Sequence, residues 1–263
     1  MLPAVLAGVA ALVLQACSKP AAALAARSEA QSNLAIDCAQ VLAQQPVVVL
    51  VLGQSNAANH GQAATSVAHP VFTTYRGQCY WAHDPLPGAS GNGGSPWPQY
   101  AQLLIEAKLA KSVLIVNRAV TATSIKQWTE PALFSAIEQV SSDLTALKLR
   151  PTLLLFQQGE ADAREATPVA DFERDLKVFL GRLRGVFPHT PILLSQSSIC
   201  RNAAHAGIRG KQAEVVSLSQ QIYPGPDTDR IAERHDGCHF SSLGLQQLAL
   251  AWFDASKAHF SSP

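Results

Sequence analysis

Four short runs of apolar, often β-branched residues recur along this 263-residue chain without the polar alternation of a half-exposed strand. They cover residues 47–52, 112–117, 152–156 and 191–195. Continuous runs of this length are typical of strands buried on both faces of a parallel sheet. Between and after them lie helical patterns, at about residues 98–110, 132–147, 168–187, 207–221 and 243–258. Strands that alternate with helices predict a three-layer α/β/α sandwich.

The clearest of the helices is the one over 168–187. Its apolar residues fall on one face, at Phe172, Leu176, Phe179, Leu180 and Leu183. We expect Thr167 to cap it, with Pro168 at the first helical position and Pro188 blocking its continuation.

Polar clusters follow three of the predicted strands. They are Ser55 after the first strand, residues 119–124 after the second and residues 157–160 after the third. Ligands of parallel α/β sheets bind beyond the carboxyl ends of the strands, so these clusters predict a site at that edge. The long Gly- and Pro-rich segment 56–95 is expected to be a loop that shapes a substrate cleft.

The N-terminal segment predicts export. Residues 1–16 are almost wholly apolar and uncharged, too short for a membrane span but suited to a signal peptide. Leu14 to Cys17 resembles a bacterial lipobox, which makes Cys17 the expected lipidation site, although the usual basic residues before the apolar stretch are missing. A plain signal peptide cut elsewhere, or a buried helix, is the alternative. Residues 17–45 are expected to be a tether followed by a docking segment, and the protein to be lipid-anchored in the bacterial periplasm or at the outer membrane.

Four cysteines remain beyond Cys17, an even number that permits two disulfides in an oxidising compartment. The preferred pairing is Cys38–Cys79 and Cys200–Cys238, and four reduced, buried thiols are the alternative. The net charge of +1 and the absence of a basic run with aromatics argue against nucleic-acid binding. Contact with a membrane is expected only through the lipid anchor, and the oligomeric state is left open.

Two segments offer the parts of a hydrolytic site. Gly53-Gln54-Ser55-Asn56 alone is an ordinary turn, and a serine needs a base to become a nucleophile. Asp236 and His239 supply a carboxylate and an imidazole that can meet within one turn, although this spacing also occurs in caps and surface loops. His235 is the rival base. His60, His69 and His83 lie in the long segment and are candidates for substrate binding or simply exposed.

Together these segments resemble the SGNH hydrolase superfamily, in its sialate O-acetylesterase-like branch (carbohydrate esterase family 6 and relatives). The resemblance covers about residues 46–256. Its blocks match residues 53–56, 93–97, 123–128 and 156–162, with Phe156 in place of tryptophan, followed by Arg209 with Gln212 and Asp236 with His239. It implies a flavodoxin-like fold with a mainly parallel, five-stranded sheet, in a domain that extends from residue 46 to residue 263.

The resemblance also implies the roles of individual residues. Ser55 would be the nucleophile, His239 the base and Asp236 its orienting carboxylate. The oxyanion would bind the N–H groups of Ser55 and Gly94, with Gly93 as the alternative to Gly94, and the side-chain amide of Gln158. Further residues expected to bind substrate are Gln54, Asn56, Glu160 and Arg209.

The implied activity is hydrolysis of small acyl esters, above all O-acetyl groups, on a carbohydrate. No metal or other cofactor is expected, because no His-Glu-x-x-His or Cys-x-x-Cys pattern is present. The alternatives are an SGNH thioesterase or lipase-like esterase, an O-acyltransferase, and a non-catalytic glycan-binding lipoprotein.

Overall fold

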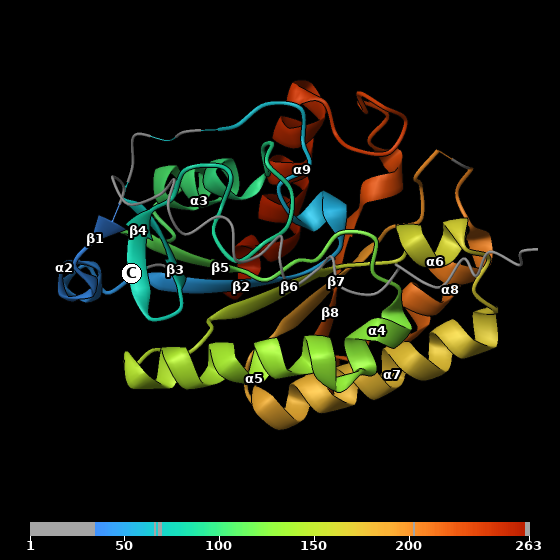
Figure 1. Ribbon diagram of the computed structural model, residues 1–263, viewed down its shortest axis with the longest axis horizontal. Helices are drawn as coiled ribbons and strands as arrows, with labels where there is room; N and C mark the ends of the chain where they lie inside the picture. The colour runs from blue at the N-terminus through green and yellow to red at the C-terminus, as the bar shows by residue number, and fades with distance from the viewer. Residues whose placement is uncertain (1–34, 66, 68–69, 202, 261–263) are drawn as a thin grey trace, which may run out of the picture.

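The computed structural model describes residues 35–260 apart from 66, 68–69 and 202. The predicted signal peptide, the lipidation site Cys17 and the tether up to residue 34 lie outside the described residues. A central sheet is covered by helices on both faces, which confirms the predicted α/β class (Figure 1). One face carries α3 (Trp97–Glu106) and α9 (Ser242–Ser256), and the other carries α5 (Pro131–Ala146) and α7 (Val169–Val186).

The sheet has eight strands in the described part of the chain, not the five expected. They are β1 (Ala35–Ile36), β2 (Val47–Gly53), β3 (Val71–Tyr75), β4 (Gln78–Trp81), β5 (Val113–Asn117), β6 (Leu153–Gln157), β7 (Ile192–Gln196) and β8 (Ile222–Asp227). Their order is β1-β4-β3-β5-β2-β6-β7-β8. The pairs β1–β4 and β4–β3 are antiparallel, and all other neighbours are parallel.

The four additional strands differ chemically from the four predicted ones. The hairpin β3–β4 lies within residues 56–95, which were expected to be a loop, and its short strands carry polar Thr73, Thr74 and Gln78. Strand β8 contains two prolines and a glycine, residues that disfavour a strand assignment. Strand β1 comes from the segment expected to dock, and it pairs with β4 at the sheet edge.

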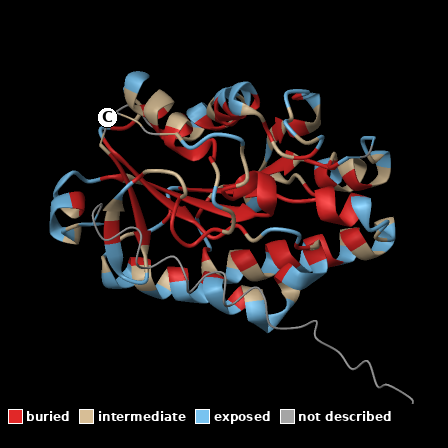
Figure 2. Cartoon of the chain, turned by 45° about the horizontal axis from the view of Figure 1, so that its top comes forward, coloured by how far each residue is buried: buried red, intermediate tan, exposed pale blue. Residues whose placement is uncertain are grey.

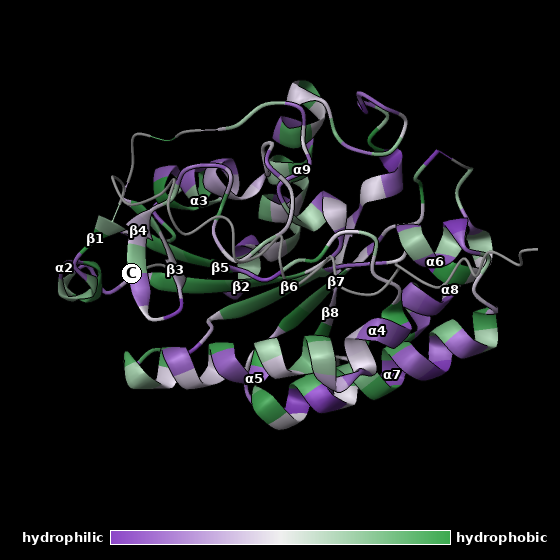
Figure 3. Ribbon diagram, in the orientation of Figure 1, coloured by the Kyte–Doolittle hydropathy of each residue, from purple (hydrophilic) through white to green (hydrophobic). Residues whose placement is uncertain are grey.

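The predicted buried strands are buried as expected. Strands β5 and β6 are buried along their whole length, and the sheet lies buried between the helices (Figure 2). One apolar cluster joins the sheet to α5 and α7, and a second joins it to α3 and α9. The covering helices present apolar residues to the sheet and mainly polar residues outward (Figure 3), although Val178 of α7 and Leu243 and Leu250 of α9 are exposed. Burial on both faces explains why these strands lack polar alternation.

The predicted helices are present with shifted ends. Helix α7 begins at Val169 with Pro168 as its N-cap residue, so Thr167 does not cap it. The Thr167 hydroxyl instead donates to the Asp162 carboxylate at 3.3 Å. Helix α8 (Ala206–Glu214) ends earlier than expected and is followed by the 3₁₀ turn η3 (Leu218–Gln220). The remaining helical segments are α2 (Cys38–Ala43), η2 (Ser55–Ala57), α4 (Ile125–Thr129), α6 (Glu160–Arg164), η4 (Thr228–Arg230) and η5 (Lys257–His259).

Two disulfides, Cys38–Cys79 and Cys200–Cys238, have the pairing preferred from the sequence. The first joins α2 to β4, and the second joins two loops beyond the carboxyl edge of the sheet. Disulfides of this kind are typical of proteins that fold outside a reducing cytosol. Within the described ranges, no helix has both the length and the apolar character needed to cross a membrane.

Asp84 links distant parts of the segment 56–95 and gives the fold a pH dependence. Its carboxylate accepts hydrogen bonds from the Thr65 N–H and from the N–H and hydroxyl of Ser95. Burial raises the pKa of Asp84 from 3.8 to about 6, and these hydrogen bonds offset only part of that effect. The folded chain therefore binds this proton more tightly than the unfolded chain does.

We expect the stability conferred by Asp84, relative to an Asp84→Asn variant, to be greatest below pH 4 and to fall as the pH rises to about 6. Across this pH range the difference in free energy of unfolding between the wild type and Asp84→Asn should change by about 1–2 kcal/mol. This is less than the full pKa shift implies, because the carboxylate retains some contact with solvent. Urea unfolding of both proteins between pH 4 and 7 measures this difference. A constant difference across that range would contradict the prediction.

Candidate active site

Ser55 lies where the connections of the parallel sheet change direction. Strand β2 lies between β5 and β6, and the chain leaves it at the carboxyl edge to form η2. The turn between them is fixed on both sides, because the Gln54 N–H donates to the Gln157 carbonyl and the Val120 N–H donates to the Gly53 carbonyl. Such a change of direction is where open α/β sheets bind ligands. Ser55 is 4% exposed at the base of this edge.

Asp236 and His239 form a hydrogen-bonded pair in the loop before α9. The Asp236 carboxylate is 2.8 Å from Nδ1 of His239 and also accepts the backbone N–H groups of Cys238 and His239. Burial alone would raise the pKa of Asp236, but these hydrogen bonds outweigh it and hold the pKa well below its usual range. Asp236 therefore remains a carboxylate wherever an imidazole titrates.

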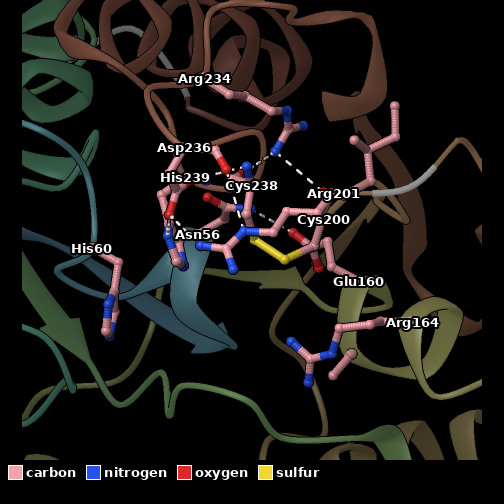
Figure 4. Close-up of a disulfide and its surroundings, with 12 residues drawn as sticks. Asn56, His60, Glu160, Arg164, Cys200, Arg201, Arg234, Asp236, Cys238 and His239 are labelled. Atoms are coloured by element: carbon pink, nitrogen blue, oxygen red, sulfur yellow. Dashed lines mark hydrogen bonds and ion pairs between the residues drawn. A yellow bond between two sulfur atoms is a disulfide. The ribbon is translucent and has the colours of Figure 1, made fainter.

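Three further contacts hold this loop in place (Figure 4). The Cys200–Cys238 disulfide ties it to the loop after β7. The side chain of Asn56 donates to the carbonyl of Cys238 at 3.2 Å, and Arg234 donates to the same carbonyl. The loop that carries the acid–base pair is thus fixed to the residue next to Ser55.

Ser55 and His239 line one pocket of about 160 Å³. The other residues that line it are Gln54, Thr121, Ala122, Arg164, Cys200, Arg201 and Cys238. They come from the ends of β2 and β5, from α6, and from the two loops joined by the disulfide. A larger hollow of about 800 Å³ beside α7 and β8 contains none of the predicted catalytic residues. The chemistry therefore points to the smaller pocket.

The side chain of Gln158 is not placed to bind an oxyanion, contrary to expectation. It is 1% exposed, and its amide nitrogen donates to the Thr123 carbonyl and to the Asp162 carboxylate at 3.0 Å. Its amide oxygen accepts the indole N–H of Trp128 at 3.2 Å. Both amide hydrogens are used inside the protein, so Gln158 supports the loops around the pocket.

The backbone N–H of Gly94 is also hydrogen-bonded within the protein, so it is not free to bind an oxyanion. Its N–H donates to the Gly61 carbonyl at 2.9 Å, and the N–H of the alternative, Gly93, donates to the Asn59 carbonyl at 2.8 Å. In contrast, the N–H groups of Ser55 and Ala122 make no hydrogen bond to another described residue. Ala122 has a left-handed backbone conformation with φ +56°, which alanine adopts at a cost. Its N–H was not considered in the sequence-based prediction.

The four expected substrate-binding residues divide into two groups. Gln54 lines the pocket, although its side-chain oxygen accepts the Ala161 N–H at 2.9 Å. Asn56, Glu160 and Arg209 are not among the pocket residues. Asn56 donates to the buried Glu160 carboxylate at 3.0 Å, and burial raises the pKa of Glu160 despite this bond. Arg209 is paired with Asp227 and Asp229. These three residues hold the fold rather than face the pocket.

The other histidines lie around His239 or farther away. The His60 ring stacks on the His239 ring with centroids 5.2 Å apart, and the His235 ring lies 6.1 Å from it. His235 is exposed and is not a pocket residue, so the geometry favours His239 as the base. The side-chain atoms of His235, Asp236 and His239 that could bind a metal ion lie within 4.8 Å of one another. His83 is partly buried, and His69 lies outside the described residues.

Four pocket residues were missed by sequence reasoning: Thr121, Ala122, Arg164 and Arg201. Thr121 and Ala122 follow β5 and fall within the polar cluster 119–124, so the end of that strand was the signal available. Arg164 ends α6, and Arg201 follows a disulfide cysteine. Nothing in the local sequence distinguishes these two arginines from the others.

Comparisons with known proteins identify the family and the fold. Residues 45–256 match the family model described as carbohydrate esterase, sialic acid-specific acetylesterase. No curated protein sequence matches the chain significantly.

Several solved structures share the fold. A protein from Arabidopsis thaliana has a TM-score of 0.67 at 18% identity, with 82% of this chain and 100% of that chain covered. A carbohydrate acetylesterase from Xanthomonas citri has a TM-score of 0.55 at 14% identity, covering 81% and 56%. A family 3 carbohydrate esterase from Clostridium thermocellum has a TM-score of 0.51 at 12% identity, covering 80% and 95%. At these identities the likeness shows the fold.

Proposed function

The chain belongs to the SGNH family of sialic acid-specific acetylesterase-like carbohydrate esterases and is a carboxylic ester hydrolase, and from this we propose that it removes O-acetyl groups from a carbohydrate with Ser55 as nucleophile. The observation that carries the proposal is the shared pocket of Ser55 and His239, with the Asp236 carboxylate 2.8 Å from Nδ1 of the imidazole.

The proposed reaction has two steps. The Ser55 hydroxyl attacks the acetyl carbonyl, and Nε2 of His239 takes its proton, since Nδ1 is occupied by Asp236. Collapse of the tetrahedral intermediate breaks the bond to the sugar oxygen, which His239 protonates. Water activated by His239 then cleaves the acetyl-enzyme and releases acetate. Asp236 remains ionised throughout and stabilises the imidazolium.

The proposed oxyanion donors are the backbone N–H groups of Ser55 and Ala122. Both belong to pocket residues, and neither is committed to another described residue. Preorganised N–H groups of this kind each contribute about 10²–10³ in rate. This assignment replaces Gly94 and Gln158, whose hydrogens are used within the protein.

The pocket favours a small acyl group. Its volume of about 160 Å³ and its mixture of polar and charged residues contrast with the wide apolar cleft that a long acyl chain requires. The lipase-like alternative is therefore less well supported than acetyl-ester hydrolysis. We also propose that the protein acts outside the cytosol, anchored through Cys17, which palmitate labelling of wild type and Cys17→Ser would test.

A fluorophosphonate probe tests the proposed nucleophile. We expect stoichiometric labelling of the folded protein at Ser55, located by peptide mass spectrometry, because phosphonates react with serines activated by a base. Labelling should disappear after urea unfolding. Modification at a different serine, or none in the folded protein, would remove the mechanism.

A further inference from the structure

Three side chains able to bind a metal ion lie on one short loop beside the pocket of Ser55. The ligand atoms of His235, Asp236 and His239 lie within 4.8 Å of one another. A zinc ion bonds nitrogen and oxygen at about 2.0–2.2 Å, so two ligands of a tetrahedral zinc ion lie about 3.3 Å apart. The Asp236 carboxylate and Nδ1 of His239 are already 2.8 Å apart. The exposed ring of His235 is therefore the ligand that has to move, by rotation of its side chain.

The backbone of this loop is closed before any ion binds. Arg234 and Phe240 form an isolated β-bridge at its base. One step further along the loop, the His235 N–H donates to the His239 carbonyl at 2.9 Å. These contacts bring the two histidines to the same end of a tight turn, with Asp236 between them in the chain. Little backbone order has to be gained on binding, which lowers the entropic cost of assembling the three ligands.

The partners of the three side chains also suit a metal site. Histidines that bind a metal usually donate their second ring N–H to a carbonyl or carboxylate, which orients the ring. Nε2 of His235 lies 3.4 Å from the His60 carbonyl, which can only accept, so Nδ1 is the nitrogen with the lone pair. Oδ1 of Asp236 accepts the backbone N–H groups of Cys238 and His239 at 2.9 and 2.7 Å. Oδ2 of Asp236 is thereby directed toward Nδ1 of His239.

We propose that His235, Asp236 and Nδ1 of His239 bind a zinc ion and that this ion inhibits the esterase. Two imidazoles and a carboxylate are a common ligand set for zinc and leave its fourth position to water. A neutral imidazole has one N–H and one lone pair. When zinc displaces the Nδ1 proton of His239 to solvent, Nε2 takes up a proton from solvent and can no longer accept the proton of Ser55. Binding stands on the loop geometry alone, whereas inhibition rests on the proposed function.

Arg201 is the group that zinc has to displace. Its Nη2 lies 3.3 Å from the Asp236 carboxylate, and its side chain is 69% exposed (Figure 4). Exposed ion pairs are weak, so this contact opposes the ion only slightly. Removal of Arg201 should therefore strengthen zinc binding, whereas removal of a ligand should weaken it. Opposite effects from two neighbouring side chains would distinguish this site from zinc bound elsewhere on the protein.

The first test is calorimetry with ZnCl₂, which does not depend on catalysis. The Ser55→Ala protein with intact disulfides is titrated alone and combined with His235→Gln, Arg201→Gln or His189→Gln. We expect His235→Gln to weaken the site at least about 10-fold, because even loss of an outer partner lowers metal affinity about 10- to 100-fold.

The other two variants set the direction and the background of this experiment. Arg201→Gln should strengthen binding about 2- to 5-fold. His189→Gln removes an exposed histidine before β7, at the opposite edge of the sheet, and should have no effect. Equal zinc binding with and without His235→Gln, or weaker binding in Arg201→Gln, would overturn the inference.

The second test measures hydrolysis of 4-nitrophenyl acetate at increasing concentrations of ZnCl₂. Without zinc, His235→Gln and His189→Gln should match the wild-type rate, because neither histidine is among the described residues that line the pocket. We expect zinc to inhibit the wild type and His189→Gln equally, and to inhibit His235→Gln only at a concentration at least about 10-fold higher. A chelator should restore the wild-type rate. MgCl₂ should not inhibit, since Mg²⁺ prefers oxygen ligands.

The outcomes separate the metal site from the proposed function. Inhibition of the wild type and His235→Gln at the same zinc concentration, or zinc binding without any inhibition, would overturn the inference. Zinc binding that is lost in His235→Gln, together with no hydrolysis of any ester by the wild type, would leave the metal site in place and sink the proposed function.

Discussion

Replacing Ser55 by alanine should lower kcat for acetate release from an acetylated sugar by at least about 10⁴-fold. Loss of the nucleophile in a serine hydrolase removes the covalent route, and only the binding and oxyanion contributions remain. Ser55 is buried at the base of the pocket, and its side chain makes no hydrogen bond to another described residue, so the change leaves the surrounding fold intact. Steady-state assays with the purified variant measure the loss.

Two controls accompany this experiment: the same substitution at a serine away from the pocket, and a measurement of thermal stability. Ser142→Ala, an identical change on the exposed face of α5, should retain full activity. The thermal midpoint of Ser55→Ala should stay within a few degrees of wild type. If Ser55→Ala kept even a tenth of wild-type activity, the hydroxyl of Ser55 would not be the nucleophile.

Gly53→Ala should destabilise the protein by at least about 4 kcal/mol and abolish activity in whatever folded protein remains. Gly53 has φ +134°, a conformation that residues with a side chain rarely adopt, and a Cβ there would overlap the carbonyl oxygen of Gln157. That carbonyl belongs to the backbone of β6, which cannot move aside without breaking the sheet. The strained residue would lie two positions before Ser55 in the chain. Urea unfolding and esterase assays measure both effects.

The matched control is Gly77→Ala in the β3–β4 turn. Gly77 also has a positive φ, +74°, but nothing lies within 4 Å of an added Cβ. We expect a cost of about 1–2 kcal/mol from the backbone conformation alone and no change in kcat. Equal losses in the two variants would show that backbone conformation, rather than contact with β6, sets the cost at Gly53.

The four central strands could be predicted from the sequence, because a strand buried on both faces is a nearly continuous run of apolar residues. Strands β2, β5, β6 and β7 are apolar up to their carboxyl ends and were identified within one or two residues. The strands missed lie at or toward the sheet edges. There, Thr73 in β3 and Pro224 in β8 lack the apolar continuity of a buried strand. Their place in the sheet depends on contacts between distant segments, which periodicity does not report.

The candidate site divides in the same way. Ser55, Asp236 and His239 belong to motifs that are weak one by one but that together, in their order along the chain, resemble one family, so they could be singled out before the structure. The oxyanion donors could not, because a backbone N–H leaves no trace in residue type. Gly94 and Gln158 were chosen for their residue types, yet their hydrogens bind the Gly61 carbonyl and the Thr123 and Asp162 oxygens. Arg201 lies at the pocket because the Cys200–Cys238 disulfide joins its loop to the loop that carries Asp236.

The Cys200–Cys238 bond also has a consequence for when the chain is expected to become active. Cys238 lies between Asp236 and His239, so a newly made chain with free thiols lacks the covalent link that holds both residues toward Ser55. Thiols stay free in a reducing cytosol and pair once an oxidant is met. Acetyl esters inside the producing cell would therefore meet an immature form of the enzyme. We therefore expect full hydrolytic activity to develop only once this disulfide has formed, which an assay of the reduced and the reoxidised protein would measure.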